Sequence, residues 1–135
     1  QRSCGEKDEM KKKDNLSRIL VIDDDPDMLR LVESMLVPVG YQVLTAPSGR
    51  MGLELAEVSR GNVDLLLTDV VMPEMGGEEV ALAFKRTYPG TRVLFMSAYL
   101  KPSMQKYGDV FGSVEFIVKP FTLSKLLGKI KKMLV

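Results

Sequence analysis

The chain has 135 residues, of which 45% are hydrophobic and 27% are charged, and its formal net charge is +1. This length suits one compact domain with its own core, and the composition is that of a globular protein rather than a disordered or fibrous one. No apolar run reaches the roughly eighteen residues that a membrane span needs, and a single cysteine, Cys4, excludes an internal disulfide.

Residues 1–17 form a polar segment that we expect to be a flexible linker or tail, followed by one domain over residues 18–135. The segment has no positive region followed by an apolar stretch, so it contains no readable secretory signal, and a cytoplasmic setting is expected. Its Lys11-Lys12-Lys13 run is flanked by Glu9 and Asp14, which is typical of a solvated linker. Neither nucleic acid nor a membrane surface is therefore an expected partner.

From Arg18 onward, short apolar runs alternate with amphipathic stretches, a pattern typical of repeated strand-helix units and a parallel sheet. The first run, Ile19-Leu20-Val21-Ile22, predicts a strand that is buried on both faces. Asp25 and Pro26 then predict the N-cap and first turn of a helix that ends near Pro38 and Gly40. The residues expected on its buried face are Leu29, Val32 and Leu36.

The second unit begins with a shorter run from Tyr41 to Thr45, which predicts an outer strand. Residues 48–60 predict a helix that stops at Gly61. The residues expected on its buried face are Met51, Leu55 and Val58. Residues 63–68 predict a central strand, and a third helix is expected from Gly77 toward Tyr88.

The last two units complete five strand-helix pairs. Residues 93–96 predict the fourth strand, residues 102–108 a short helix, and residues 115–118 a second outer strand. Residues 122–134 predict the final helix, with Thr122 as its cap. The residues expected on its apolar face are Leu126, Leu127, Ile130, Met133 and Leu134.

Carboxylates follow two of the central strands at the points where those strands end. Asp23 and Asp24 come directly after the first strand, and Asp69 ends the third. Right-handed crossovers in a doubly wound sheet place these strand ends side by side, and carboxylates so close repel one another unless a cation joins them. All three donors are oxygens and the chain has no histidine, so Mg²⁺ or Mn²⁺ is expected rather than zinc or copper.

Two further polar residues end neighbouring strands: Ser97 ends the fourth and Lys119 follows the fifth. At such a site a carboxylate can attack phosphorus as a nucleophile, while a metal and a lysine neutralise the charge of the transferred group. Taken one at a time, these residues are explained as well by a helix cap, a turn or a solvated strand end. Their joint placement at four strand ends indicates a phosphoryl-transfer site.

Four segments carry a resemblance to a known family. They are Ile19-Leu20-Val21-Ile22-Asp23-Asp24-Asp25-Pro26, Leu67-Thr68-Asp69-Val70-Val71-Met72-Pro73, Phe95-Met96-Ser97-Ala98 and Val118-Lys119-Pro120-Phe121. In this order they closely resemble the receiver domains of bacterial response regulators, over about residues 18–135. The resemblance implies a flavodoxin-like, doubly wound α/β fold with five parallel strands in the order 2-1-3-4-5 and five helices.

The resemblance also implies roles for individual residues. Asp69 would accept phosphate from a phosphohistidine and serve as a metal ligand. Asp24 would bind Mg²⁺ directly, Asp23 largely through water, and Val71 through its backbone carbonyl.

Three more residues would act around the phosphate. Lys119 would pair with Asp69 or its phosphoryl group, Ser97 would move to bond the phosphate, and Phe116 would repack inward as the switch. One departure from the family is the pair Gly76-Gly77, where Asp-Gly is common, and this pair is expected to loosen the loop.

The chain has no histidine, so the phosphodonor, a histidine kinase or a histidine phosphotransfer domain, must lie outside these residues. The motif wording and the charged lead-in resemble the carboxy-terminal receiver of hybrid sensor histidine kinases, which is the favoured origin. A stand-alone single-domain response regulator is the alternative. The domain would catalyse its own aspartyl phosphorylation and dephosphorylation rather than act as a conventional enzyme, and a homodimer through the fourth and last helices is open.

Two other functions fit the sequence less well. A magnesium-dependent phosphatase of the haloacid dehalogenase type would need a second aspartate two residues after Asp69, where Val71 stands. A flavin-binding flavodoxin-like protein would need a glycine- or hydroxyl-rich phosphate loop after the first strand, where the sequence is Asp23-Asp24-Asp25-Pro26.

Overall fold

The computed structural model describes residues 17–98 and 115–135, which contain a five-stranded parallel sheet in the order β2-β1-β3-β4-β5. The strands are β1 (Arg18–Ile22), β2 (Gln42–Ala46), β3 (Leu65–Asp69), β4 (Arg92–Ser97) and β5 (Glu115–Val118). This confirms the predicted strand order, with the two shorter runs at the edges. The observed bounds differ from the predicted ones by at most two residues.

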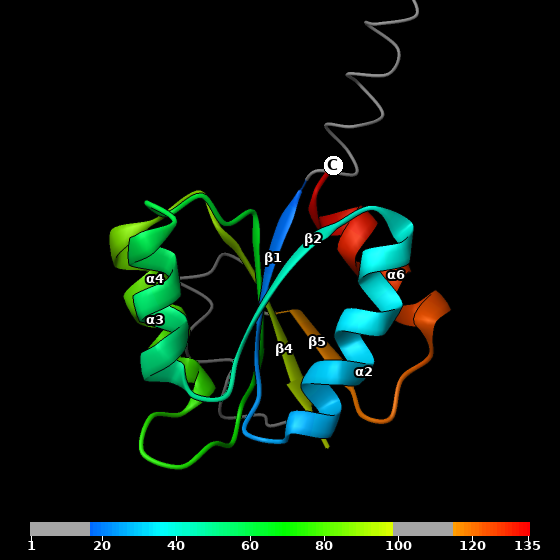
Figure 1. Ribbon diagram of the computed structural model, residues 1–135, viewed down its shortest axis with the longest axis horizontal. Helices are drawn as coiled ribbons and strands as arrows, with labels where there is room; N and C mark the ends of the chain where they lie inside the picture. The colour runs from blue at the N-terminus through cyan, green and yellow to red at the C-terminus, as the bar shows by residue number, and fades with distance from the viewer. Residues whose placement is uncertain (1–16, 99–114) are drawn as a thin grey trace, which may run out of the picture.

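Helices cover both faces of the sheet, as a doubly wound fold requires (Figure 1). One face carries α2 (Pro26–Leu36), which continues into the 3-10 turn η1 (Val37–Val39), and α6 (Leu123–Met133). The other face carries α3 (Gly49–Val58) and α4 (Gly77–Thr87). The helix predicted over residues 102–108 lies outside the described residues.

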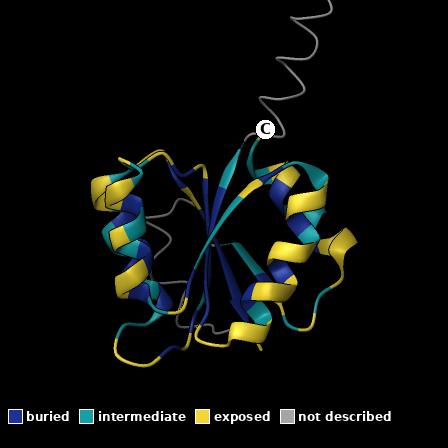
Figure 2. Cartoon of the chain, in the orientation of Figure 1, coloured by how far each residue is buried: buried dark blue, intermediate teal, exposed yellow. Residues whose placement is uncertain are grey.

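The central strands are buried on both sides because their side chains alternate between two cores. In β1, Leu20 and Ile22 enter the core beneath α3 and α4, whereas Ile19 and Val21 enter the core beneath α2 and α6. All four are fully buried, and each such side chain contributes about 1.5–3 kcal/mol to stability. Figure 2 shows the buried strands between helices whose outer sides are exposed. The sheet therefore holds its strand ends in fixed positions.

Two predicted helix caps are confirmed. The carboxylate of Asp25 accepts a hydrogen bond of 2.9 Å from the Asp27 amide, and the hydroxyl of Thr122 accepts one of 3.1 Å from the Lys125 amide. The predicted buried face of the first helix is also confirmed, because Leu29, Val32 and Leu36 are its buried residues. In α6, Leu126 and Ile130 are buried, while the other three residues predicted there are partly buried.

The predicted buried face of the second helix is only partly right: Leu55 is partly buried and packs against the core, but the other two predicted residues do not. Met51 and Val58 are 48% and 81% exposed, and α3 instead buries Gly49, Gly52 and Ala56. The reason is close packing against the sheet: a Cβ on Gly52 would lie only 2.2 Å from the Cδ1 of Ile22. Large side chains do not fit there, so α3 turns its small residues inward.

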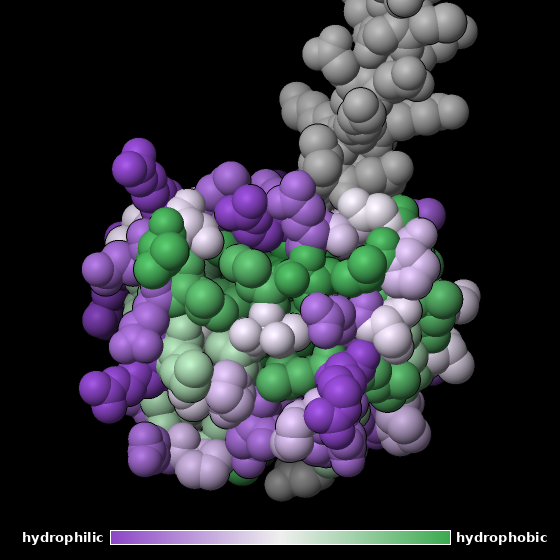
Figure 3. Space-filling model, in the orientation of Figure 1, coloured by the Kyte–Doolittle hydropathy of each residue, from purple (hydrophilic) through white to green (hydrophobic). Residues whose placement is uncertain are grey.

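No helix in the described residues is both long and apolar enough to cross a bilayer. On the face drawn in Figure 3, apolar side chains gather around the edge strand β2, and polar side chains surround them. Apolar atoms make up more than half of the accessible surface of a typical folded protein, so this exposure is usual.

Candidate functional site

The parallel sheet brings the polar residues predicted for the site to one edge. Asp69 is the last residue of β3, and its register partner in β4 is Met96, next to Ser97. Ser97 in turn pairs with Val118, the residue before Lys119. Asp23 follows Ile22, which is paired with Thr68, the residue before Asp69. Each strand therefore ends beside its neighbour, which places four residues close together at the carboxyl ends of the strands: Asp23, Asp69, Ser97 and Lys119.

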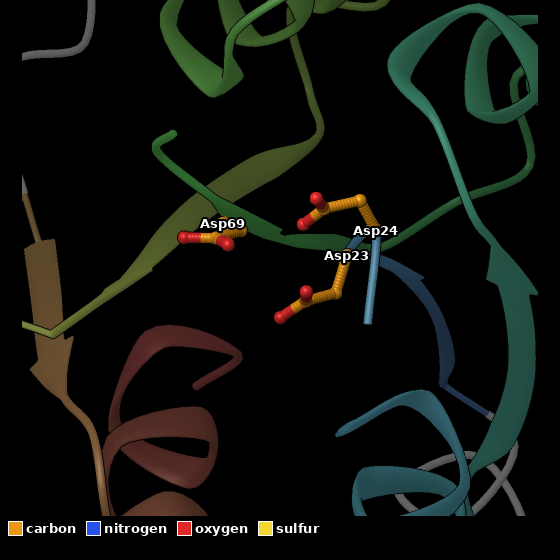
Figure 4. A group of neighbouring side chains, drawn as sticks. All are labelled: Asp23, Asp24 and Asp69. Carbon is orange, nitrogen blue, oxygen red and sulfur yellow. The ribbon is translucent and has the colours of Figure 1, made fainter. Parts of the chain in front are cut away.

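The three aspartates converge as predicted (Figure 4). Asp23, Asp24 and Asp69 each offer a carboxylate oxygen, and these atoms all lie within 4.8 Å of one another. Their surroundings differ: the side chain of Asp23 is 1% exposed, that of Asp69 is 14% exposed, and Asp24 is exposed. Asp23 is held in place because its Oδ1 accepts a hydrogen bond of 2.9 Å from the Asp25 amide.

Lys119 reaches into this group of carboxylates from the end of β5. Its Nζ donates a hydrogen bond of 2.8 Å to Oδ2 of Asp23 and lies 3.4 Å from Oδ2 of Asp69. The sequence predicted a pairing with Asp69, whereas the structure shows the shorter contact with Asp23. The Lys119 amide also donates to the Ser97 carbonyl at 2.8 Å, and the Lys119–Pro120 peptide bond is cis.

Burial and charge shift the titration of two of these groups. Burial raises the pKa of the Asp69 carboxyl above its ordinary value, Lys119 opposes this shift, and the negative charge of Asp23 adds to it. Burial alone would lower the pKa of Lys119, but its hydrogen bond to Asp23 and the charges of Asp23 and Asp69 outweigh burial and raise it. Lys119 is therefore positively charged, and within residues 17–98 and 115–135 it is the only cation that forms an ion pair with these aspartates.

This donor set fits a hard divalent cation. The carboxylates carry more negative charge than Lys119 neutralises, and each supplies an oxygen, the ligand atom that Mg²⁺ prefers. Burial and the charge of Asp23 both raise the pKa of Asp69, and a bound dication would oppose both by favouring the ionised carboxylate.

The remaining predicted residues lie around the carboxylates. Val71 is 58% exposed, and its backbone amide donates to the Asp69 carboxylate. Ser97 is buried at the end of β4. Phe116 in β5 packs against Phe95, with ring centroids 5.6 Å apart and an interplanar angle of 34°. The predicted inward repacking of Phe116 as the switch stays a prediction.

Sequence reasoning missed two residues that position Asp69. A Cβ on Gly77 would lie 2.1 Å from the Asp69 carbonyl oxygen, so only glycine lets α4 begin this close to the end of β3. The Gly77 amide also donates to the Val70 carbonyl at 2.9 Å. The buried Thr68 hydroxyl donates to the Asp69 carbonyl at 3.0 Å. The Gly76-Gly77 pair was the sequence signal that could have identified this contact. Gly77 is needed there because the backbones of α4 and β3 approach closely.

Comparison with known proteins agrees with this geometry. The sequence pattern of the response regulator receiver domain matches residues 19–131. The sensor kinase CckA of Brucella abortus is 34% identical over 116 residues, which span 86% of this chain and 12% of CckA. The response regulator receiver protein CpdR of the same organism is 32% identical over 120 residues, 89% of this chain and 98% of CpdR.

A solved structure supports the same assignment. The response regulator TrrA from Thermotoga maritima, determined in complex with Mg²⁺-BeF, superposes with a TM-score of 0.73 at 30% identity and covers 87% of this chain and 99% of TrrA. Fold, site geometry and sequence agree, so the chain belongs to the response regulator receiver domain family and is a phosphoacceptor module of two-component signalling.

Proposed function

We propose that Asp69 accepts the phosphoryl group, with Mg²⁺ held by Asp23, Asp24, Asp69 and the backbone carbonyl of Val71. Receiver domains bind Mg²⁺ at a cluster of acidic residues, and such a cluster is present here. The observation that carries the proposal is the approach of three carboxylates to within 4.8 Å, with Lys119 in contact with two of them.

The surroundings of the three acids favour Asp69 as the nucleophile. Both oxygens of Asp23 are engaged, Oδ1 by the Asp25 amide and Oδ2 by Lys119, and the side chain is almost fully buried. Asp24 is exposed, and in the described residues it forms no ion pair with a cation. Asp69 is the acid that is both reachable from solvent and close to Lys119.

The transfer follows from these positions. A carboxylate oxygen of Asp69 forms a bond to phosphorus as the N–P bond of the phosphohistidine breaks, and the bonding electrons return to the imidazole nitrogen. Lys119 then faces the new phosphoryl oxygens, and Ser97 can donate its hydroxyl to one of them. Bound Mg²⁺ supplies charge neutralisation for the transferred group. Phe116, beside Phe95, would report the change by repacking.

Receiver domains take phosphate from histidine kinases or phosphotransfer proteins. We propose an origin in a hybrid sensor kinase for this chain, supported by the similarity to CckA, while the similarity to CpdR favours the stand-alone alternative. The reading frame upstream of Gln1 decides between them. A cytoplasmic location and a homodimer stay predictions, to be tested by cell fractionation and by sedimentation with and without phosphodonor.

The phosphoacceptor proposal is tested with the purified chain, Mg²⁺ and acetyl phosphate, followed by intact mass. We expect the wild type to gain the mass of one phosphoryl group and Asp69→Asn to gain none. Asp64→Asn is the matched control, because Asp64 lies at the opposite edge of the sheet, where its Oδ2 accepts the Arg18 amide at 2.8 Å. Phosphorylation of Asp69→Asn at the wild-type rate would refute the assignment.

A further inference from the structure

A second concave site lies at the amino ends of the strands, opposite the carboxyl ends that carry the three aspartates. It is a cavity of about 250 Å³ where β4 and β5 begin and α6 ends. Figure 1 shows the carboxyl terminus at this end of the molecule, near the start of β1. β4 runs from Arg92 in this cavity to Ser97 at the aspartate site, which separates the two sites by roughly 17 Å.

Cationic side chains dominate the lining of the cavity. The cations are Lys85 from α4, Arg92 from β4, and Lys129 and Lys132 from α6. Glu115 forms an ion pair of 3.3 Å with Lys129. The other three cations have no ion-pair partner within residues 17–98 and 115–135. Glu115 is the one acidic side chain of the lining, so four cationic side chains face a single carboxylate side chain.

The cations are close enough to affect one another. Burial lowers the pKa of Lys85, and the positive charge of Arg92 lowers it further. Burial and the repulsion from Arg92 thus both oppose the charged form of Lys85, and an anion between the two side chains would favour that charged form.

We propose that this cavity binds the phosphate group of a small molecule. The excess of positive charge suits a phosphate dianion, and Arg92 offers the planar, two-pronged donor set that suits phosphate oxygens. Lys85 and Lys132 add two compact charges to the lining. The concave shape favours a compact anion over the extended surface of a nucleic acid or an acidic protein. The site is independent of Asp69 and of the phosphoacceptor proposal.

The test is a titration of the ¹⁵N-labelled chain followed by NMR. Mg²⁺ is removed with a chelator, so that the bare aspartates repel phosphate and the two sites are not confused. The probes are inorganic phosphate and glucose 6-phosphate, each compared with sodium chloride at equal ionic strength. We expect saturable shifts of the Lys85, Arg92 and Lys132 amides. Tighter binding of glucose 6-phosphate identifies an ester as the ligand, and tighter binding of inorganic phosphate identifies the free ion; either result supports the proposal.

Matched variants distinguish phosphate binding at this cavity from nonspecific attraction of phosphate to the positive charges of the chain. The double variant Lys85→Gln/Arg92→Gln should weaken binding by at least about tenfold, whereas Lys131→Gln, an exposed lysine of α6 outside the cavity lining, should change it by less than about twofold. Lys85→Arg keeps the charge and should retain binding. Shifts no larger than those with chloride, or equal weakening by Lys131→Gln, would overturn the proposal. So would binding of an acidic peptide or duplex DNA at these residues when neither phosphate binds.

Discussion

Asp69 combines partial burial with a nearby like charge, and both raise its pKa in the folded chain. A carboxyl group with a raised folded pKa binds its proton more tightly in the native state than in the unfolded state. Its ionisation therefore lowers the free energy of unfolding as the pH rises from the ordinary value to the raised one. Without metal, the ionised Asp69 needed for phosphoryl transfer destabilises the fold.

We expect Asp69→Asn to raise the free energy of unfolding of the magnesium-free chain by up to about 1 kcal/mol at neutral pH, because it removes that ionised group. The gain should disappear as the pH falls below 3.8, the ordinary pKa of the group, where the wild-type carboxyl is also neutral. Urea denaturation in chelator at a series of pH values measures it. The electrostatic account would be contradicted if the variant were less stable than wild type at neutral pH. It would also be contradicted if the difference in free energy of unfolding between the two proteins did not change with pH.

Individual site residues were predictable from the sequence because each ends a strand whose neighbours follow from the topology. The partner of Lys119 was only half predictable. Strand order places Lys119 near both Asp23 and Asp69, but the direction of a long, flexible side chain depends on local packing. The sequence pattern does not contain that information.

At the level of elements, the start of α4 controls where Asp69 sits. Gly77→Ala would place a Cβ against the Asp69 carbonyl oxygen, a backbone atom that cannot move aside without displacing β3 or α4. We expect a loss of about 1–3 kcal/mol in the free energy of unfolding and a slower gain of phosphoryl mass from acetyl phosphate.

The matched control for this change is Gly128→Ala in α6, where a new Cβ meets nothing within 4 Å. Removing glycine from a helix interior should stabilise the chain by about 0.5–1 kcal/mol and leave phosphorylation unchanged. Urea denaturation and intact mass follow both variants. If Gly77→Ala behaves like Gly128→Ala, close packing between α4 and β3 does not position Asp69.

The presence of the described helices and strands was largely predictable from the sequence, but the face that α3 turns toward the sheet was not. Hydrophobic spacing favoured Met51, Leu55 and Val58 as the buried face, because large apolar residues dominate any hydropathy pattern, and of these only Leu55 packs against the core. The helix instead packs through Gly52 and Ala56, which carry almost no such signal. Close approach to Ile22 decides the orientation, and only the assembled sheet shows it.

The whole fold was predictable for a simple reason: three continuous apolar runs require strands covered on both faces, which in turn requires helices on both sides of a parallel sheet. The same topology brings together acids that are far apart along the chain. Asp23 and Asp69 meet only in the folded state, so a cation that needs both binds the native chain and not the unfolded one.

Magnesium should therefore stabilise the entire fold by mass action, by about 2.7 kcal/mol when its free concentration is one hundred times its dissociation constant. Urea denaturation at increasing MgCl₂, with NaCl at equal ionic strength as the reference, measures this gain. Asp24→Asn removes an exposed carboxylate from the cluster and should reduce the gain, whereas Asp64→Asn at the opposite edge should leave it unchanged. Equal gains in both variants would mean that Mg²⁺ stabilises the chain from some place other than these three carboxylates.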